Sequence, residues 1–464
     1  MEDLLRSAIS GCEGSYADAR YEKTRSTVIS CNGPDIEGVG ATNFEGGAIR
    51  VLADGGLAFA SFDRPDDKAA KEAAAMAERC ARATVEASRV TQGLAPAPVV
   101  RTEVRPRPVI DPRTVPFEEK RDLLLHYAKT ALEVPGVSQV RLAYREQERE
   151  EWFVNSEGSR ILQEVLICYI SGRILAKEGD QVEYLSAAIG FAPDFAKLKG
   201  REDVFLERAK LAAQLTKASH APAGAYQVIT DPSLGGVFIH EAFGHLSETD
   251  TQVYNPPIRE MMQLGKRLGG EHLQVYDWAD VQDGPGSYYY DHEGVKARKT
   301  TIIKDGVLVG KLLSRHSAFH LGGEATGNYR ARDYRYIPLI RQSNICIGGG
   351  TTTKEEMLSQ VKDGLYLCGA RGGQTMGDFF TFGCEYGFRI KDGKIGELVR
   401  GTNISGNVER TLADITHVGD DFTIIEGGGC GRSRAGFFNI QLLDKSGRAS
   451  PHVLINNLVV GGAK

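Results

Sequence analysis

The 464-residue sequence predicts an α+β fold, with mixed α/β layers first and a glycine-rich, mainly antiparallel β domain after them. Three observations predict this class. In the first half, strand hairpins are flanked by helices and do not alternate strictly with them, which is typical of α+β layers. A proline-rich stretch divides that half. Glycine is then concentrated in the second half, among short apolar segments and turn sequences.

Residues 1–95 are predicted to form an N-terminal α+β subdomain. A helix at the start precedes two segments with strand-like alternation, RYEKTRSTVIS (20–30) and GGAIRVLADGGLAFASF (46–62). The Asp54-Gly55 pair inside the second segment favours a hairpin turn, because both residue types tolerate positive φ. The alanine-rich stretch 66–90 has high helix propensity throughout.

Residues 96–116 (PAPVVRTEVRPRPVIDPRTVP) are interpreted as a linker, because proline lacks a backbone donor and favours extended chain. Residues 117–222 then repeat the earlier pattern as a middle α+β subdomain. Helices are expected at 117–134 and 201–218, with strands around 152–170 between them.

Residues 223–464 are predicted to form a C-terminal, β-rich domain that carries the candidate site. Three Lys-Asp-Gly sequences, beginning at residues 304, 362 and 391, are expected to be turns between antiparallel strands. One helix is expected to interrupt the sheet after the strand AYQVITD (225–231). Asp231 can cap such a helix, and Pro232 suits its first position, where no N–H is needed.

The composition is that of a folded protein with a mixed-charge surface. There are 56 basic and 61 acidic residues, a net charge of -5, so nothing points to direct nucleic-acid binding or a basic membrane face. Neither a signal-peptide pattern nor an apolar run long enough for a membrane span is visible, so we expect a soluble, cytoplasmic protein. The eight cysteines include no CxxC pair, which argues against a disulfide scaffold or a zinc ribbon.

The segment GGVFIHEAFGHLSETD (235–250) contains a candidate metal site. His240 and His245 are five positions apart, whereas the HExxH motif of zinc hydrolases places its histidines four apart. Positions i and i+5 differ by roughly 140° around a regular helix, which is too far for two imidazoles to bind one ion. A π-bulge or local unwinding would absorb the additional residue, most easily at Gly244. The alternative is an apolar helix with two hydrogen-bonded core histidines.

A third ligand is needed to hold a zinc ion firmly. Cys430, in IIEGGGCG, is the best candidate, because its glycine neighbours allow a close backbone approach and a thiolate is a strong ligand. The alternative for this residue is a buried core thiol. Glu248, Asp250, His292 and Cys384 are further candidates.

The segment YQVITDPSLGGVFIHEAFGHLSETD, the sequence GGGCG and the ending INNLVVGGAK together resemble the TldD/PmbA metallopeptidase family, and in it the TldD-type subunit that carries HExxxH. The resemblance implies that His240, His245 and Cys430 bind Zn²⁺ and that Glu241 is the catalytic base. It also implies a metalloprotease acting on unfolded or small peptides. It implies a dimer as well, formed either by two copies of this chain or by this chain with a TldE/PmbA-like subunit.

Three protein ligands would leave a fourth position for a water molecule, whose proton Glu241 could accept. A different function is also considered: a non-catalytic regulatory or binding subunit of a peptidase or of a DNA gyrase-modulating complex. A glutamate beside a metal ligand argues for the enzyme, because a binding protein has no need of a base there. Arg371 could bind a peptide carboxylate, although a surface arginine in a turn is an equal alternative.

Overall fold

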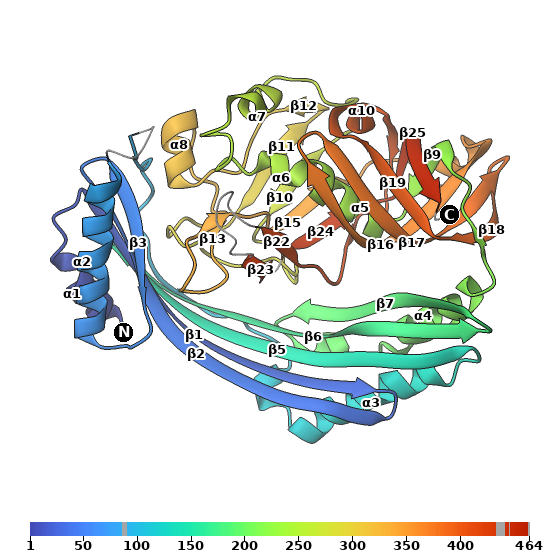
Figure 1. Ribbon diagram of the computed structural model, residues 1–464, viewed down its shortest axis with the longest axis horizontal. Helices are drawn as coiled ribbons and strands as arrows, with labels where there is room; N and C mark the ends of the chain where they lie inside the picture. The colour runs from blue at the N-terminus through green and yellow to red at the C-terminus, as the bar shows by residue number, and fades with distance from the viewer. Residues whose placement is uncertain (86–90, 433–440, 445, 463–464) are drawn as a thin grey trace.

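A computed structural model describes residues 1–85, 91–432, 441–444 and 446–462. The first half of the chain forms one long, curved sheet, and the second half sits on the concave side of that sheet (Figure 1). The mixture of helices and strands, with a β-rich C-terminal half, confirms the α+β class that the sequence predicts.

Strands from both predicted subdomains of the first half share this sheet. In the described residues it comprises β1 (Tyr16–Asn32), β2 (Asp35–Ala53), β3 (Gly56–Phe62), β4 (Arg101–Val104), β5 (Val137–Asn155), β6 (Arg160–Glu178) and β7 (Gln181–Ala192). The order is β3-β2-β1-β5-β6, and β4 and β7 both pair with β6. The proline-rich stretch 96–116 therefore contributes a strand, which runs parallel to β6.

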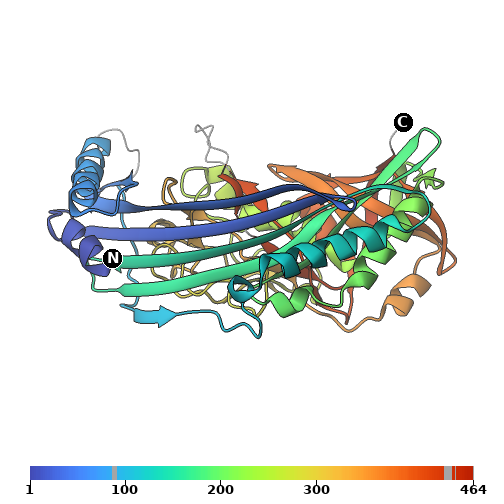
Figure 2. The ribbon, with the colours of Figure 1, turned by 90° about the horizontal axis from the view of Figure 1, so that it is seen from below.

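Helices pack against this sheet near its two ends (Figure 2). They are α1 (Glu2–Ser10), α2 (Asp67–Thr84), α3 (Phe117–Leu132) and α4 (Glu202–Leu215), with short 3₁₀ turns η1 (Pro112–Thr114) and η2 (Phe195–Leu198). Alanines such as Ala70 and Ala77 face inward on α2 and are fully buried, which allows this helix to lie close to β2 and β3. The predicted helix 66–90 is confirmed to Thr84, and its last five residues lie outside the described ranges.

The Asp54-Gly55 turn is confirmed between β2 and β3. Both residues have positive φ, 53° and 84°, and Ala53 pairs with Gly56 across the turn. A two-residue turn of this kind matches the right-handed twist of the strands that it joins.

The second half contains two larger sheets. The eight-stranded one comprises β8 (Ser219–His220), β9 (Gly224–Thr230), β16 (Asp363–Met376), β17 (Phe379–Lys391), β18 (Lys394–Arg400), β19 (Thr402–Asn407), β20 (Ile415–Val418) and β25 (Val453–Gly462). The six-stranded one comprises β10 (Val275–Trp278), β11 (Lys299–Lys304), β12 (Val307–Leu308), β15 (Asn344–Ile347), β21 (Thr423–Ile424) and β24 (Gly447–Ser450). Two small pairs complete the described strands, β13 (Tyr329–Arg330) with β14 (Leu339–Ile340) and β22 (Cys430–Arg432) with β23 (Gln441–Asp444).

Two of the three Lys-Asp-Gly turns are confirmed. Asp305-Gly306 joins β11 to β12 and Asp392-Gly393 joins β17 to β18, each with positive φ at both residues. The prediction for residues 362–364 is wrong, because this sequence follows a helix and Asp363 already begins β16.

The expectation of one helix in this half is also wrong. Besides α5 (Pro232–Ile239) and its continuation η3 (His240–Gly244) and α6 (His245–Ser247), there are α7 (Pro256–Met261), α8 (Arg315–Leu321), α9 (Lys354–Ser359) and α10 (Val408–Ala413). These helices are too short to show an apolar period, but each begins with a side-chain cap, as in the Thr353–Glu356 capping box of α9. Every helix in the described part of the chain is too short or too polar for a transmembrane span.

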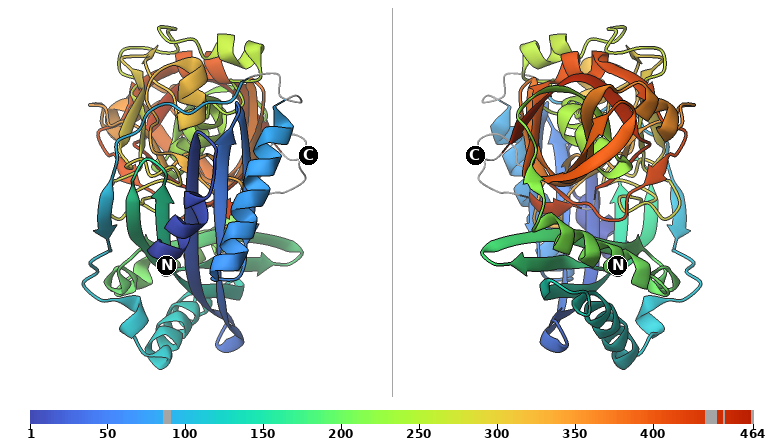
Figure 3. Two further views of the ribbon diagram at one scale, coloured as in Figure 1. Left: turned by 90° about the vertical axis from the view of Figure 1, so that its left-hand side faces the viewer. Right: turned by 90° about the vertical axis from the view of Figure 1, so that its right-hand side faces the viewer.

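Helix α5 lies between the two larger sheets, and the eight-stranded sheet curls around it (Figure 3, right). Phe238 on this helix packs edge-on against Phe380, with ring centroids 5.5 Å apart, and also against Phe382. The main apolar core of the molecule surrounds these rings. The helix that leads into the candidate site is therefore held in place by packing on both sides.

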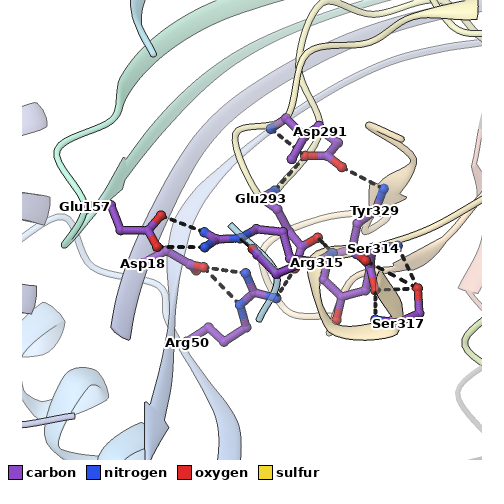
Figure 4. Close-up of polar contacts among 11 residues, drawn as sticks. Asp18, Arg50, Glu157, Asp291, Glu293, Ser314, Arg315, Ser317 and Tyr329 are labelled. Atoms are coloured by element: carbon purple, nitrogen blue, oxygen red, sulfur yellow. Dashed lines mark hydrogen bonds and ion pairs between the residues drawn. The ribbon is translucent and has the colours of Figure 1, made fainter. Parts of the chain in front are cut away.

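A buried ionic network joins the long sheet to the second half (Figure 4). Arg50 donates to Asp18 at 2.5 and 3.0 Å within the sheet, and at 2.8 Å to Glu293 from the second half. Arg315 binds Glu157 through two hydrogen bonds, of 2.7 and 2.9 Å. Because removing one member would leave a buried charge without a partner, this network fixes how the two halves meet.

Candidate metal centre

The helix that carries the histidines starts as the sequence predicts. Strand β9 ends at Thr230, and the Asp231 carboxylate accepts a hydrogen bond of 2.7 Å from the backbone N–H of Leu234. Pro232 occupies the first turn, where its missing N–H costs nothing.

The additional residue between the histidines is absorbed by a π turn. The backbone changes from α-helix to π-helix over His240–Gly244 and returns to α-helix at His245. The two imidazole rings come to lie 4.9 Å apart between centroids, at 83° to each other. The π-bulge inferred from the five-residue spacing is therefore confirmed, and both rings point to the same side of the helix.

Cys430 is brought to these rings by the segment just before β22. Gly428 has a φ of 134°, and a Cβ there would lie 2.2 Å from the carbonyl oxygen of Ser446, so the close approach requires glycine. Cys430 Sγ lies 3.3 Å from His245 Nε2. In the described residues, donor atoms of His240, His245 and Cys430 all lie within 4.8 Å of one another.

This donor set suits a zinc ion. Tetrahedral zinc with bonds of about 2.0–2.3 Å keeps its ligand atoms roughly 3.3–3.8 Å apart. The 3.3 Å between Cys430 Sγ and His245 Nε2 has this value already.

Glu248 orients His245 from behind. Its Oε2 lies 2.9 Å from His245 Nδ1, and its Oε1 accepts the backbone N–H of Gln342 at 3.1 Å. The carboxylate is fully buried, so the imidazole has a fixed partner at Nδ1 and presents Nε2 to Cys430. Glu248 was a candidate for the third ligand, but it contacts the nitrogen that faces away from the thiol.

The other candidates for the third ligand have different surroundings. His292 Nδ1 lies 2.5 Å from an Arg20 nitrogen in the contact between the two halves. Cys384 is buried in the main apolar core, and Asp250 is absent from the donor cluster. Arg371, considered for carboxylate binding, already donates to Glu183 at 3.1 Å.

Burial and nearby charges shift the titration of the site. Burial lowers the pKa of His240 well below its usual value, and the charges of His245 and Arg448 act in the same direction. Burial also acts to lower the pKa of His245, but Glu248 and Cys430 outweigh it and raise this pKa to about 10. Burial raises the pKa of Glu241, against the opposing effect of His245 and Arg448. His240 is thus a neutral donor, and a metal ion would displace a proton from His245.

Two residues of the site carry no signal in the sequence motifs. Gln342 Nε2 lies 3.4 Å from the carbonyl oxygen of His240 and contacts the π turn. Arg448 crosses Gly236, where a Cβ would lie 3.2 Å from Arg448 Cγ. Both reach the site because β15 and β24 pair in parallel beside α5. A pairing between segments a hundred residues apart cannot be read from local patterns.

Family models for the PmbA/TldA metallopeptidase match the chain in three parts. Domain 1 matches residues 17–81, the central domain matches residues 110–219 and the C-terminal domain matches residues 223–462. The chain belongs to the PmbA/TldD metallopeptidase family. The family resemblance of the sequence motifs is thereby confirmed.

Similar proteins carry names that agree with the PmbA/TldD assignment. A metalloprotease of Synechocystis is 33% identical over 452 residues, covering 97% of this chain and 95% of the relative. A zinc metalloprotease TldD homolog of Saccharolobus solfataricus is 32% identical over 335 residues, 71% and 72% of the two chains. The crystal structure of TldE from Thermococcus kodakarensis has the same fold, with a TM-score of 0.73 over the full length of both chains at 19% identity.

Proposed function

We propose that this PmbA/TldD member is a zinc-dependent peptidase that hydrolyses peptide bonds in unfolded or small peptides. In this proposal His240, His245 and Cys430 bind the zinc ion and Glu241 is the general base. The observation that carries it is that donor atoms of these three residues lie within 4.8 Å of one another, beside a π turn that also holds Glu241. The name of the Saccharolobus relative supports zinc as the metal.

Each ligand is prepared by its surroundings. His240 is neutral, and His245 presents Nε2 because Glu248 holds its other nitrogen. The thiol of Cys430 already lies against that Nε2. When bound, zinc would polarise the scissile carbonyl and make the attacking water more acidic.

Glu241 is placed to move protons. Its Oε2 lies 3.9 Å from His245 Nε2, so the carboxylate faces the same space as the donor atoms. The side chain is 21% exposed, which leaves it open to a water molecule or a peptide. In the proposed reaction it accepts a proton from the attacking water and donates one to the leaving amine.

The exposure of the site supports a flexible substrate. His245 and Glu241 are each about one-fifth exposed, whereas His240 is 3% exposed and Cys430 is 7% exposed. An extended peptide can reach such a recessed position, but the surface of a folded domain cannot approach it as closely.

The proposal includes an assembly of two subunits, either two copies of this chain or one copy with a TldE-like chain. The full-length likeness to TldE supports a partner of the same fold. Sedimentation of the chain alone and of a mixture with a TldE-like chain from the same organism tests this part. A chain that stays monomeric in both samples would contradict it.

The proposed activity is tested by removing and restoring the metal. A chelator should abolish cleavage of an unstructured fluorogenic peptide, and one equivalent of zinc should restore it. Glu241→Gln should keep the zinc and lose roughly 10²–10⁴-fold in kcat. Cleavage that survives complete zinc removal would contradict the proposal. A zinc-loaded chain that is inactive alone and with its partner would favour the non-catalytic subunit.

A further inference from the structure

A cavity of about 830 Å³ lies between the two halves of the molecule, and its lining extends to Gly428, two residues before Cys430. Its walls come from β6, β7 and α4 of the first half, and from α5, β16, β17, β24 and residues 423–428 of the second. Four arginines and three carboxylates line it: Arg173, Arg201, Arg208, Arg448, Asp231, Glu385 and Glu426. The volume is at the upper end of what small-ligand pockets offer, and a short peptide segment fits it.

The carboxylates of this cavity are already engaged. Glu426 binds Arg201 through two hydrogen bonds, of 2.7 and 3.0 Å. Glu385 binds Arg208 at 2.9 Å and also accepts the backbone N–H of Ser186 at 3.0 Å. The third carboxylate caps α5. Glu385 and Glu426 therefore already have arginine partners, and Asp231 accepts the backbone N–H groups of Leu234 and Gly369.

Arg448 is a partly buried cation that lacks such a partner. Its Nε is buried without a hydrogen-bond acceptor, and across the described ranges no hydrogen bond or ion pair of its guanidinium is found. Leaving a buried charged donor without an acceptor is costly, so a ligand that supplies one would bind well. Of the other cations lining the cavity, Arg173 is exposed and stacks on Tyr184 at 5.0 Å.

Arg448 also connects the cavity to the metal centre. Its aliphatic part lies against Gly236, one turn before His240. Burial lowers the pKa of Arg448, and the nearby charges of Glu241, Cys430 and Glu385 oppose this shift. A ligand bound to this guanidinium would therefore lie beside the carboxylate that we propose as the base.

We infer that Arg448 binds a carboxylate of the peptide substrate in this cavity. A guanidinium has planar, paired donors that match the two oxygens of a carboxylate. The carboxylate can be the C-terminal one or an Asp or Glu side chain near the cleaved bond. This inference rests on the proposed peptidase function, and Arg448 is a substrate-binding residue in it.

The test measures binding without catalysis. Fluorescence anisotropy of the full-length, metal-free chain is recorded with dye-labelled, unstructured peptides. One has a free C-terminus and an acidic residue, and the others lack one or both carboxylates through amidation or Asn and Gln. The peptide without carboxylates should bind at least about 10-fold more weakly than the peptide with both. The two peptides that lack a single carboxylate show whether Arg448 binds the C-terminal carboxylate or the acidic side chain.

Variants assign the effect to Arg448. R448Q should weaken binding of the acidic peptide by about 10-fold or more and should change binding of the carboxylate-free peptide by less than about 2-fold. R448K should have an intermediate effect. R173Q removes a charge from the same cavity and should change neither. In the zinc-loaded chain, R448Q should raise KM and leave kcat nearly unchanged.

Equal affinity of the native chain for all the peptides would overturn the inference. An R448Q variant that weakens the binding of every peptide by the same factor would also overturn the inference. The same holds if R448Q lowers kcat and leaves KM unchanged. If R448Q fails to fold by circular dichroism, R448K and the peptide series on the native chain decide. Peptide binding without any cleavage after zinc loading, both by the chain alone and with its partner, would refute the peptidase and leave the assignment of Arg448 as a carboxylate-binding residue intact.

Discussion

The side chain of Gln342 occupies the space that a Cβ at position 244 would need. An ideal Cβ on Gly244 would lie 2.0 Å from Gln342 Oε1, far inside van der Waals contact. The same amide approaches the carbonyl oxygen of His240, at 3.4 Å. The glycine of the HEAFGH segment thus makes room for a residue that contacts the π turn, besides allowing the turn itself.

The effect of a Gly244 substitution on stability should therefore depend on Gln342. Gly244→Ala should lower the free energy of unfolding by about 1–3 kcal/mol in the native background, because the new methyl displaces the amide. In a Gln342→Ala background the same change should be neutral or stabilising, since alanine favours a helix by about 1 kcal/mol. Urea denaturation of the four proteins gives the coupling. Additive changes in the free energy of unfolding would show that Gln342 is not the reason why position 244 requires glycine.

Glu248 is expected to control metal affinity. Glu248→Gln keeps the size of the side chain but weakens the hydrogen bond at His245 Nδ1, so zinc affinity should fall about 10- to 100-fold. Competition with a chromogenic chelator measures this change. Glu260→Gln, an exposed position on α7, is the matched control and should leave the affinity unchanged. Equal zinc affinities for both variants would show that Glu248 does not control metal binding.

Stability near neutral pH should respond to Glu22, a buried carboxyl group between the two halves. Its Oε1 accepts the backbone N–H of Tyr334 at 3.1 Å, and burial, with the charge of Glu151 added, raises its pKa to about 7. The native state therefore holds this proton more tightly than the unfolded chain. The penalty for ionising it is absent below about pH 4.5, grows as the pH rises and is complete above about pH 7.

Glu22→Gln should consequently stabilise the protein by about 1–3 kcal/mol at pH 8 and by much less at pH 5. Thermal unfolding at both values, with the exposed Glu37→Gln as the control, measures the difference. A gain that is the same at both pH values would mean that ionisation of Glu22 is not its cause.

Local features of the sequence carried much of this architecture. The Asp231 cap, the Asp54-Gly55 turn and the bulge at the histidines each follow from a few neighbouring residues, and the structure has all three. The five-residue spacing was informative because helix geometry forbids it without a defect. Short capped helices were missed because six or seven residues do not complete two turns.

Long-range pairing could not be predicted in the same way. Nothing local indicates that the strands around residues 20 and 150 pair along their length, or that β15 and β24 run in parallel. Arg448 and Gln342 become neighbours of the histidines only through that second pairing. For Cys430, the surrounding glycines suggested a close approach, but the partner of that approach came from the fold.

X-ray absorption at the zinc K-edge, on the chain loaded with one equivalent of zinc, tests the central claim most directly. With His240, His245 and Cys430 as ligands, the spectrum should contain one sulfur at about 2.3 Å and nitrogen or oxygen neighbours at about 2.0–2.1 Å. The sulfur signal should vanish in Cys430→Ser. A native spectrum without sulfur, or a Cys430→Ser variant that binds zinc with an unchanged spectrum, would contradict the account.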